Sequence, residues 1–331
     1  MNQLRNMSFI DLFAGIGGFR IALEKFGANC VFSSEKDKYA KITYEANFGD
    51  IPAGDITKIK SEDIPPHDIL CAGFPCQPFS ISGKQKGFED SRGTLFFEIA
   101  RIVKYHRPKM LFLENVANLR RHKDGKTIDN MIKILKDLEY NVFTEILNAS
   151  DFGVPQSRKR LYFVCFRKEL GIMNFSFPKP TLEDIALEDI LLPDSETEKY
   201  IIDRDDIYMK DITINDRKLK PIRIGTINKG GQGERIYSPK GHAITLSAHG
   251  GGPGAKTGAY LVNNKVRKLA PRECALAQGF PPDFKIPVSD SQAWKQFGNS
   301  VAVPVLIKIL EKVSKYNLKT SSLKTSIEAV S

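Results

Sequence analysis

The stretch over residues 8–32 most constrains the fold of this chain. The apolar run SFIDLF leads into the glycine turn AGIGG, and the helix-forming segment FRIALEKF and the apolar run CVFS follow it. A strand that feeds a glycine turn and a helix is typical of the opening of a parallel α/β sheet, because glycine lets the backbone turn tightly at the end of the strand. The sequence therefore predicts an α/β fold.

The same texture continues through the first half of the chain and then stops. Apolar runs recur as DILCAG (68–73), MLFLEN (110–115) and RLYFVCF (160–166), and an amphipathic segment, 127–138, separates the last two. We expect a doubly wound sheet here. Ten of the 25 glycines lie between Gly225 and Gly258, where short β-like runs replace the strand–helix alternation. This change predicts a second, smaller and mostly β domain.

Composition narrows the class of protein. The 331 residues carry a formal net charge of +10, which favours polyanionic partners such as nucleic acid. The five cysteines and five histidines are scattered and form no C-x-x-C pair, so we expect neither disulfides nor a metal site. No apolar run approaches the length of a membrane span and no signal peptide is visible. We therefore expect a reduced, cytoplasmic protein without membrane contact.

Several residues suggest a ligand site at the carboxyl ends of the strands. Glu35 follows Gly15 by 20 residues, a spacing that suits a dinucleotide or any other adenosine-bearing ligand, and the alternative is a purely structural turn. Phe13 either belongs to the core or stacks on an adenine. Asp55, expected at the end of a third strand, either accepts a hydrogen bond from an adenine amine or caps a helix.

A second group of residues suggests catalysis. In GFPCQPFS, Cys76 lies past a strand end and is pinned between prolines, which suits a nucleophile. Glu114, at the next strand end, either caps the sheet edge or serves acid–base chemistry. In QSRKRLYF, Gln156, Arg158 and Arg160 alternate along an entering strand, so we expect them on one face, which either meets a ligand or is solvated.

Taken in order, these motifs resemble those of the DNA cytosine 5-methyltransferases. The resemblance rests on FIDLFAGIGG, GFPCQPFS, ENV, QSRKR, RKLAPRECALAQGFP and QFGNSVAVPV, and it covers nearly the whole chain. Within the family, CAGFPCQPFSISGKQKGFEDSRGTLFF and KGGQGERIYS are most similar to the HhaI-type bacterial modification enzymes, which recognise GCGC. The resemblance implies a class I S-adenosylmethionine-dependent methyltransferase fold with a doubly wound mixed sheet.

The resemblance also implies roles for the candidate catalytic residues. Cys76 would add to carbon 6 of a flipped-out cytosine, so that carbon 5 can take the methyl group. Glu114 would bind ring nitrogen 3 and the exocyclic amine, and Arg160 the carbonyl oxygen. Arg158 and Gln156 would support the pocket.

S-adenosylmethionine is the implied cofactor, with S-adenosylhomocysteine as its product and no metal. Its expected contacts are Phe13, Gly15, Gly17, Gly18, Glu35, Asp55, Ile56, Pro75 and Asn299.

Double-stranded DNA is the implied substrate, and the first cytosine of GCGC the expected target. We expect Gln232 and Arg235 to read the major groove, with Arg235 on a guanine. Ser82, from the loop after Cys76, would meet Gln232 in the space that the flipped base leaves. Thr245 and Lys256 would hold the flanking phosphates.

The resemblance divides the chain into functional parts. We expect a catalytic and cofactor-binding domain (1–188), a target-recognition domain (189–270), a hinge (271–298), a C-terminal helix that returns to the catalytic domain (299–316) and a tail (317–331). A monomer that works beside a cognate restriction endonuclease is the expected setting. Three alternatives remain: a transfer RNA cytosine 5-methyltransferase, a nicotinamide-dependent dehydrogenase and a DNA-binding protein without activity.

Overall fold

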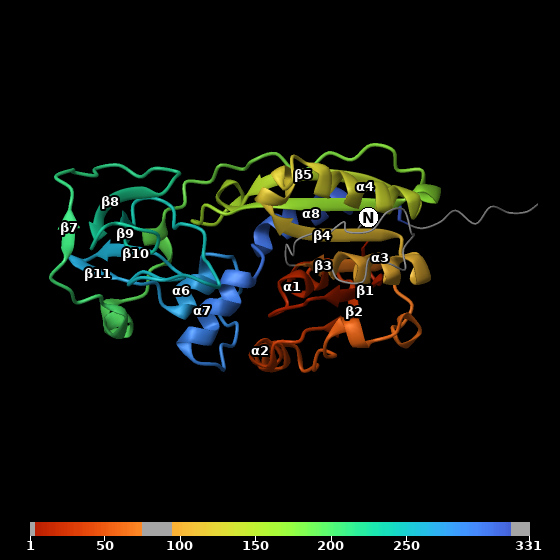
Figure 1. Ribbon diagram of the computed structural model, residues 1–331, viewed down its shortest axis with the longest axis horizontal. Helices are drawn as coiled ribbons and strands as arrows, with labels where there is room; N and C mark the ends of the chain where they lie inside the picture. The colour runs from red at the N-terminus through yellow and green to blue at the C-terminus, as the bar shows by residue number, and fades with distance from the viewer. Residues whose placement is uncertain (1–3, 75–94, 319–331) are drawn as a thin grey trace, which may run out of the picture.

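A computed structural model of the protein describes residues 4–74 and 95–318. Its first sheet has six strands in the order β2-β1-β3-β4-β6-β5 (Figure 1). Strands β2, β1, β3 and β4 are parallel to one another, whereas β6 is antiparallel to both β4 and β5. The strands are β1 (Ser8–Leu12), β2 (Asn29–Ser34), β3 (Ile69–Gly73), β4 (Met110–Val116), β5 (Tyr140–Asn148) and β6 (Lys159–Arg167). The predicted doubly wound mixed sheet is confirmed.

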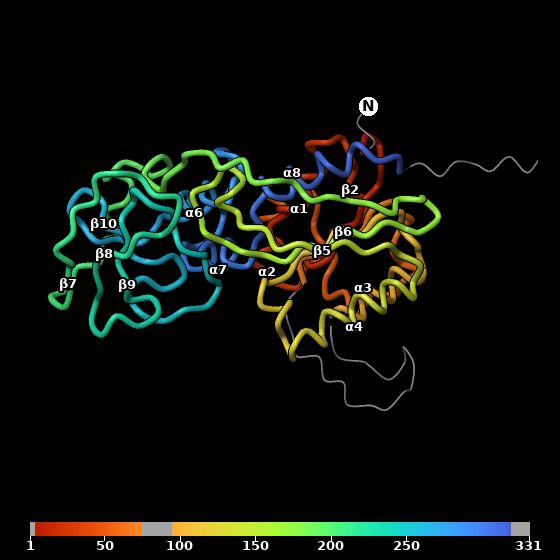
Figure 2. Tube along the Cα trace, turned by 90° about the horizontal axis from the view of Figure 1, so that it is seen from above, coloured from red at the N-terminus to blue at the C-terminus, as the bar shows by residue number. Residues whose placement is uncertain are grey.

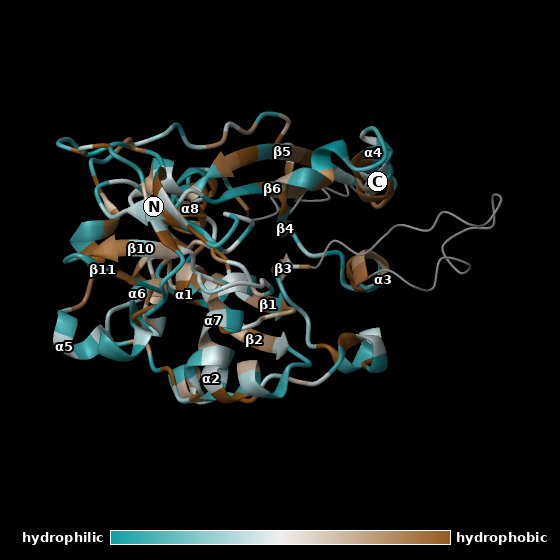
Figure 3. Cartoon of the chain, turned by 60° about the vertical axis from the view of Figure 1, so that its left-hand side comes forward, coloured by the Kyte–Doolittle hydropathy of each residue, from teal (hydrophilic) through white to brown (hydrophobic). Residues whose placement is uncertain are grey.

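Helices cover both faces of this sheet, as the two views in Figures 1 and 2 show. The α-helices of the described residues, in both parts of the molecule, are α1 (Gly18–Glu24), α2 (Lys38–Phe48), α3 (Leu95–His106), α4 (Lys126–Asp137), α5 (Asp194–Thr197), α6 (Pro271–Leu276), α7 (Asp290–Asn299) and α8 (Val303–Val313). Apolar residues of α1 and α8 pack on one face in a single buried cluster, and those of α3 and α4 pack on the other. Helix α4 has one hydrophobic and one hydrophilic side (Figure 3), as its sequence period predicts.

A second sheet of five strands lies at the other end of the molecule (Figure 1). Its order is β11-β10-β9-β8-β7, and only the β9–β10 pair is parallel. The strands are β7 (Ile207–Met209), β8 (Ile222–Ile227), β9 (Arg235–Ser238), β10 (Ala259–Val262) and β11 (Lys265–Arg267). The sheet has a small core of its own, while Tyr237, Leu246 and Tyr260 join the core of the first sheet. Packing is therefore continuous between the two sheets.

Three expectations about local structure are wrong. Asp55 does not end a third strand: the chain there makes one bridge, Ser34 to Ala53, and then enters the 3₁₀ helix η1 (Ile56–Lys58). Strand β6 begins at Lys159, so Gln156 and Arg158 precede it instead of alternating along it. The sequence PRECALAQGFPPDF (271–284) predicts one helix, but helix α6 ends at Leu276, because Gly279 and two prolines follow.

Candidate functional site

The candidate site lies where β1, β3 and β4 end. These neighbouring strands are parallel, so their carboxyl ends meet at one edge of the sheet. In open α/β sheets, ligands bind in the crevice at that edge. The glycine turn after β1, Phe74 directly after β3 and Glu114 near the end of β4 all lie there.

The glycine turn after β1 has the conformation that the sequence predicts. Gly15 and Gly17 have positive φ angles of 55° and 85°, which side chains other than glycine adopt at a cost. A Cβ atom at Gly17 would overlap the Phe48 ring, whereas one at Gly15 would meet almost no other atom. The backbone at Gly15 therefore has open space beside it, as close approach to a ligand requires. A Cβ at Gly18 would overlap Val301, so this third glycine serves packing.

Glu35 lies against the glycine turn. Its Oε2 accepts a hydrogen bond from the Gly15 amide at 2.9 Å, and its Oε1 accepts one from the Asp37 amide at 2.7 Å. A carboxylate oxygen has two lone pairs, so both oxygens can accept one more donor, such as a ribose hydroxyl. The 20-residue spacing thus brings the acid and the glycine together.

The other predicted cofactor residues have mixed surroundings. Phe13 has a positive φ of 55° and is only partly buried, so part of its ring is open to a ligand. Asp55 caps η1 by accepting hydrogen bonds from the Thr57 amide and hydroxyl, and these bonds lower the pKa of its carboxyl. Ile56 is buried beside it, and Asn299 is exposed at the end of α7. Pro75 lies outside the described residues.

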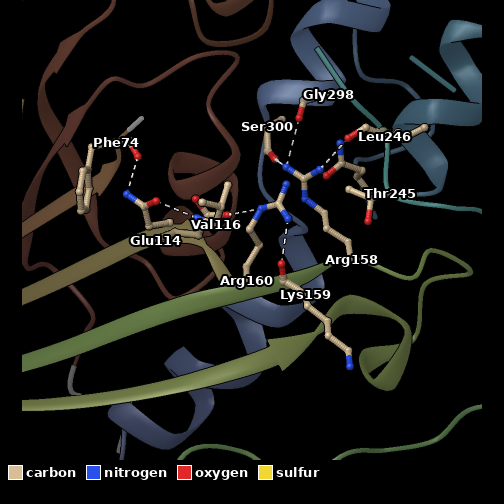
Figure 4. A network of polar contacts seen from close by, with 12 residues as sticks. Phe74, Glu114, Val116, Arg158, Lys159, Arg160, Thr245, Leu246, Gly298 and Ser300 are labelled. Carbon is tan, nitrogen blue, oxygen red and sulfur yellow. Dashed lines mark hydrogen bonds and ion pairs between the residues drawn. The ribbon is translucent and has the colours of Figure 1, made fainter. Parts of the chain in front are cut away.

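Glu114 and Arg160 form the centre of the predicted catalytic group (Figure 4). The Nε atom of Arg160 lies 3.1 Å from Oε1 of Glu114, with both side chains nearly buried. The contact lacks hydrogen-bond geometry, so this buried oxygen has no donor among the described residues. Burial raises the pKa of Glu114, although the Arg160 and Arg158 cations oppose that effect. A carboxyl group with a raised pKa and an unused oxygen is suited to exchanging a proton with a ligand.

Asn115 fixes the chain that leads to Cys76. Its Nδ2 donates a 2.8 Å hydrogen bond to the carbonyl oxygen of Phe74, two residues before the predicted nucleophile. Gly73 pairs with Glu114 across the strands β3 and β4. The described chain therefore ends beside Glu114, immediately before the predicted Cys76 segment. Cys76 and Ser82 lie outside the described residues.

Arg158 and Gln156 hold the backbone of distant segments beside the site by hydrogen bonds. The Arg158 guanidinium donates to the carbonyl oxygens of Leu246, Gly298 and Ser300, which come from two distant parts of the chain (Figure 4). Burial and, next, the Arg160 cation lower its pKa to about 9, so it stays protonated at neutral pH. The Gln156 side chain donates to the carbonyl oxygen of Ala277 and accepts a hydrogen bond from the Leu246 amide. Both side chains are almost wholly buried, so the solvated alternative is excluded for them.

The predicted DNA-reading residues lie on or beside the second sheet. Gln232 and Arg235 are exposed, in the turn before β9 and at its first residue. Glu234 fastens that turn by accepting hydrogen bonds from Asn228 and the Gly231 amide. Gly233, with a φ of 81°, packs against Gly251 and accepts a hydrogen bond from the Gly254 amide, so two glycine-rich turns support each other.

Thr245 and Lys256 lie between the two sheets. The Thr245 hydroxyl donates a 2.6 Å hydrogen bond to the carbonyl oxygen of Ser157, next to Arg158. The Lys256 ammonium donates to the carbonyl and hydroxyl oxygens of Ser291 in α7. Thr245 thus joins the glycine-rich region to the segment that carries Arg158, and Lys256 joins it to α7.

Sequence reasoning missed Asp11. This residue of β1 is fully buried, and neither carboxylate oxygen has a hydrogen-bond partner among the described residues. Its pKa is raised to about 8, mainly because the residue is buried. The Arg20 cation opposes this rise, and the Glu35 carboxylate adds to it. The signal was one acidic residue inside the apolar run SFIDLF.

In residues 4–74 and 95–318, no cluster of three or more His, Cys, Asp or Glu could hold a metal ion, and no helix is long and apolar enough to cross a membrane.

Comparison with known proteins decides the family. The model of the C-5 cytosine-specific DNA methylase family matches residues 7–315. The chain belongs to this family. It is 57% identical over 318 residues to the type II methyltransferase M.HhaI of Haemophilus parahaemolyticus, an alignment that covers 96% of this chain and 97% of the relative. It is 44% identical over 335 residues to the type II methyltransferase M.HpaII of Haemophilus parainfluenzae, covering 94% and 91%.

Solved structures of other methyltransferases share the fold of this C-5 cytosine-specific methylase. The Dnmt2 methyltransferase of Schizosaccharomyces pombe superposes with a TM-score of 0.70, covering 94% of this chain and 98% of that one at 19% identity. A putative DNA modification methyltransferase encoded within an Escherichia coli prophage gives 0.67 over 95% and 100% at 23% identity. The HhaI-type resemblance and the methyltransferase fold are therefore confirmed.

Proposed function

We propose that this DNA methyltransferase methylates carbon 5 of the first cytosine of GCGC through a covalent adduct with Cys76. The observation that carries the proposal is the Glu114–Arg160 pair at the end of β4, where the buried Oε1 of Glu114 has no hydrogen-bond donor and Phe74 leads toward Cys76. The high identity to a HhaI-type enzyme supports the choice of GCGC.

The chemistry requires each member of the group. The Cys76 thiolate forms a bond to carbon 6, and the electrons of the 5,6 double bond move to carbon 5. Carbon 5 would then bond to the methyl carbon as the bond between that carbon and the sulfonium sulfur breaks, and the sulfur would keep the electron pair. Glu114 holds a proton against ring nitrogen 3, which balances the charge that the adduct places on the ring. Arg160 donates to the carbonyl oxygen at carbon 2. A base then removes the carbon-5 proton, the double bond re-forms and the thiolate leaves.

Arg158 acts as a positioning residue in this scheme. Its guanidinium is committed to three backbone carbonyls and lies beside Arg160. It therefore fixes the backbone at Leu246, Gly298 and Ser300 around the pocket. Gln156 supports the backbone at Leu246 and Ala277.

The residues at the end of β1 fit S-adenosylmethionine, which supplies an electrophilic methyl group when bound. The open space at Gly15 admits the cofactor next to backbone, and Glu35 keeps acceptor capacity for ribose hydroxyls. Phe13 would stack on the adenine, with Ile56 beside it. Asp55 uses one oxygen as a cap and has the other for the adenine amine. Pro75 and Asn299 complete the expected set, and S-adenosylhomocysteine is the product.

For DNA recognition, we propose that the turn before β9 enters the major groove. Arg235 and Gln232 are exposed there, and Glu234 holds the turn rigid. Ser82 would approach Gln232 from the loop after Cys76, and Thr245 and Lys256 would bind phosphates on either side of the flipped cytosine. On this proposal, residues 1–188 form the catalytic domain, 189–270 the recognition domain, 271–298 a hinge, 299–316 the returning C-terminal helix and 317–331 a tail.

The proposed setting is bacterial restriction–modification. A monomer in the cytoplasm would methylate double-stranded DNA and so protect it from a cognate restriction endonuclease. A transfer RNA cytosine is the alternative substrate, and no feature of the described site favours it.

Mapping of methylated cytosines tests this function. An unmethylated plasmid and a transfer RNA mixture would each be incubated with enzyme and S-adenosylmethionine and then sequenced after bisulfite treatment. We expect conversion to be blocked only at the first cytosine of GCGC in the plasmid. Methylation at GGCC or ACGT in preference to GCGC would refute the assigned sequence. Methylation of the transfer RNA alone would refute DNA as the substrate of this site.

A further inference from the structure

A cluster of basic side chains follows the catalytic strand directly. Residues 117–126 consist of the 3₁₀ helix η3 (Ala117–Arg121), the turn that follows it and the first residue of α4. We call this segment the η3–α4 turn. Four of its side chains are cationic and exposed: Arg120, Arg121, Lys123 and Lys126. One acidic residue, Asp124, lies among them. None of these cations belongs to the predicted recognition residues.

The turn is held in one conformation. Leu119 is buried in the core beneath it, and the His122 ring lies 2.7 Å from the Thr127 hydroxyl. Lys123, Asp124 and Gly125 have consecutive positive φ angles of 51°, 56° and 84°. A left-handed backbone costs about 1 kcal/mol or more for a residue with a side chain, so the surrounding contacts must enforce this run.

Two of the cations form no ion pair in the part of the chain that the structure describes. Among the ion pairs of residues 4–74 and 95–318, none involves Arg121 or Lys126. Arg120 makes one long hydrogen bond, 3.5 Å, to the Thr144 hydroxyl. Exposed cations that are held on a rigid turn and form no ion pair with a carboxylate are suited to binding an external anion, because no ion pair within the protein has to break first.

The turn is also within reach of DNA that supplies a base to Glu114. Val116 is the last residue of β4, and Arg121 follows Glu114 by seven residues. Because a residue spans at most about 3.6 Å, the Arg121 backbone lies no further than roughly 25 Å from that of Glu114. Phosphates on one strand recur about every 3.4 Å along the duplex axis. Several phosphates beside a cytosine at Glu114 therefore pass within this range.

We propose that the η3–α4 turn is a second DNA-backbone contact, separate from the second sheet, that holds the phosphates near the target cytosine whatever their sequence. The inference rests on the proposed function in one respect, since it needs a cytosine presented at Glu114. Phosphate contacts position a duplex without reading bases, so this surface would add affinity but no preference for GCGC.

The salt dependence of DNA binding tests the proposal. The double variant Arg121→Gln/Lys126→Gln would be compared with Lys133→Gln/Lys136→Gln, a matched control on the same helix with the same charge change. The control residues are exposed and lie about 10 and 15 Å beyond Lys126 along α4. Fluorescence anisotropy would give the affinity for a GCGC duplex, and for a duplex of equal composition without GCGC, over a range of salt concentrations.

We expect the slope of log affinity against log salt to become shallower by about 2 in the first variant, since each released phosphate contact contributes about 0.9. Its affinity should fall by the same factor on both duplexes, and the control should keep the wild-type slope. An unchanged slope, or an equal change in the control, would overturn the proposal. If the wild-type enzyme showed no preference for GCGC, the assigned sequence would fail, while the difference in slope would still decide the role of the turn.

Discussion

Replacing Asp11 by asparagine should stabilise the protein at neutral pH. Asp11 is fully buried in β1, has no hydrogen-bond partner for either oxygen among the described residues, and has a pKa raised to about 8. The folded protein therefore holds a proton on Asp11 that the unfolded chain releases above its ordinary pKa of 3.8. Each pH unit between these values favours unfolding, because the unfolded state then binds fewer protons. An asparagine is neutral throughout and escapes this penalty.

The magnitude follows from the two pKa values. One pH unit corresponds to about 1.4 kcal/mol per proton, so between pH 5 and pH 8 the free energy of unfolding of the wild type should fall relative to Asp11→Asn by up to about 4 kcal/mol. Water that enters near a buried carboxylate reduces such penalties, so a difference of about 1 kcal/mol is the least that the reasoning allows.

Urea denaturation of both proteins at pH 5, 6, 7 and 8 measures this difference. Asp68→Asn is a control of opposite sign. Burial opposes the ionised form of Asp68, but hydrogen bonds from Lys109 and Ser8 outweigh it and lower its pKa. Its ionised form therefore stabilises the fold above the unfolded pKa and loses that effect as the pH falls. If the stability gap between wild type and Asp11→Asn stayed constant from pH 5 to pH 8, the assignment of a raised pKa to Asp11 would be refuted.

Three further changes test other parts of the account. Glu114→Gln should lower the single-turnover methylation rate roughly 10²–10³-fold, because the amide cannot exchange a proton with the ring, while anisotropy shows unchanged DNA affinity. Arg158→Lys should cost about 2–4 kcal/mol in urea unfolding, since an ammonium cannot reach three carbonyls at once. Gly233→Ala should abolish the preference for GCGC over other duplexes, because its Cβ would overlap Gly251 and displace the turn that carries Gln232.

Local sequence signals were sufficient for much of the fold. Apolar runs bounded by glycine or proline located β1, β3 and β4. The spacing of Gly15 and Glu35 suggested that both belong to one ligand site, and the structure joins them by a hydrogen bond. Strand β5 had no such signal. It is one of the two edge strands of the first sheet, most of its residues are partly exposed, and polar residues interrupt its sequence.

The supports of the site could not be read from neighbouring residues. Arg158 meets Leu246, 88 residues away, and Gly298, 140 residues away, so its burial depends on how distant segments pack. Periodicity suggested a polar face along a strand, yet the strand begins after Arg158 and the guanidinium serves backbone carbonyls. The unpartnered state of Asp11 likewise depends on α1, α2 and two neighbouring strands, which no local pattern encodes.

The central claim is that Cys76 attacks carbon 6 of a cytosine held at Glu114 and Arg160. The most direct test uses a duplex in which 5-fluorocytosine replaces the first cytosine of GCGC. A base can remove the proton from carbon 5 but cannot remove fluorine in its place, so the adduct persists. With S-adenosylmethionine present, denaturing electrophoresis and peptide mass spectrometry should find a one-to-one covalent complex in which the DNA is attached to Cys76, and none with Cys76→Ser. An equal yield of covalent complex from Cys76→Ser, or attachment at another residue, would contradict the account.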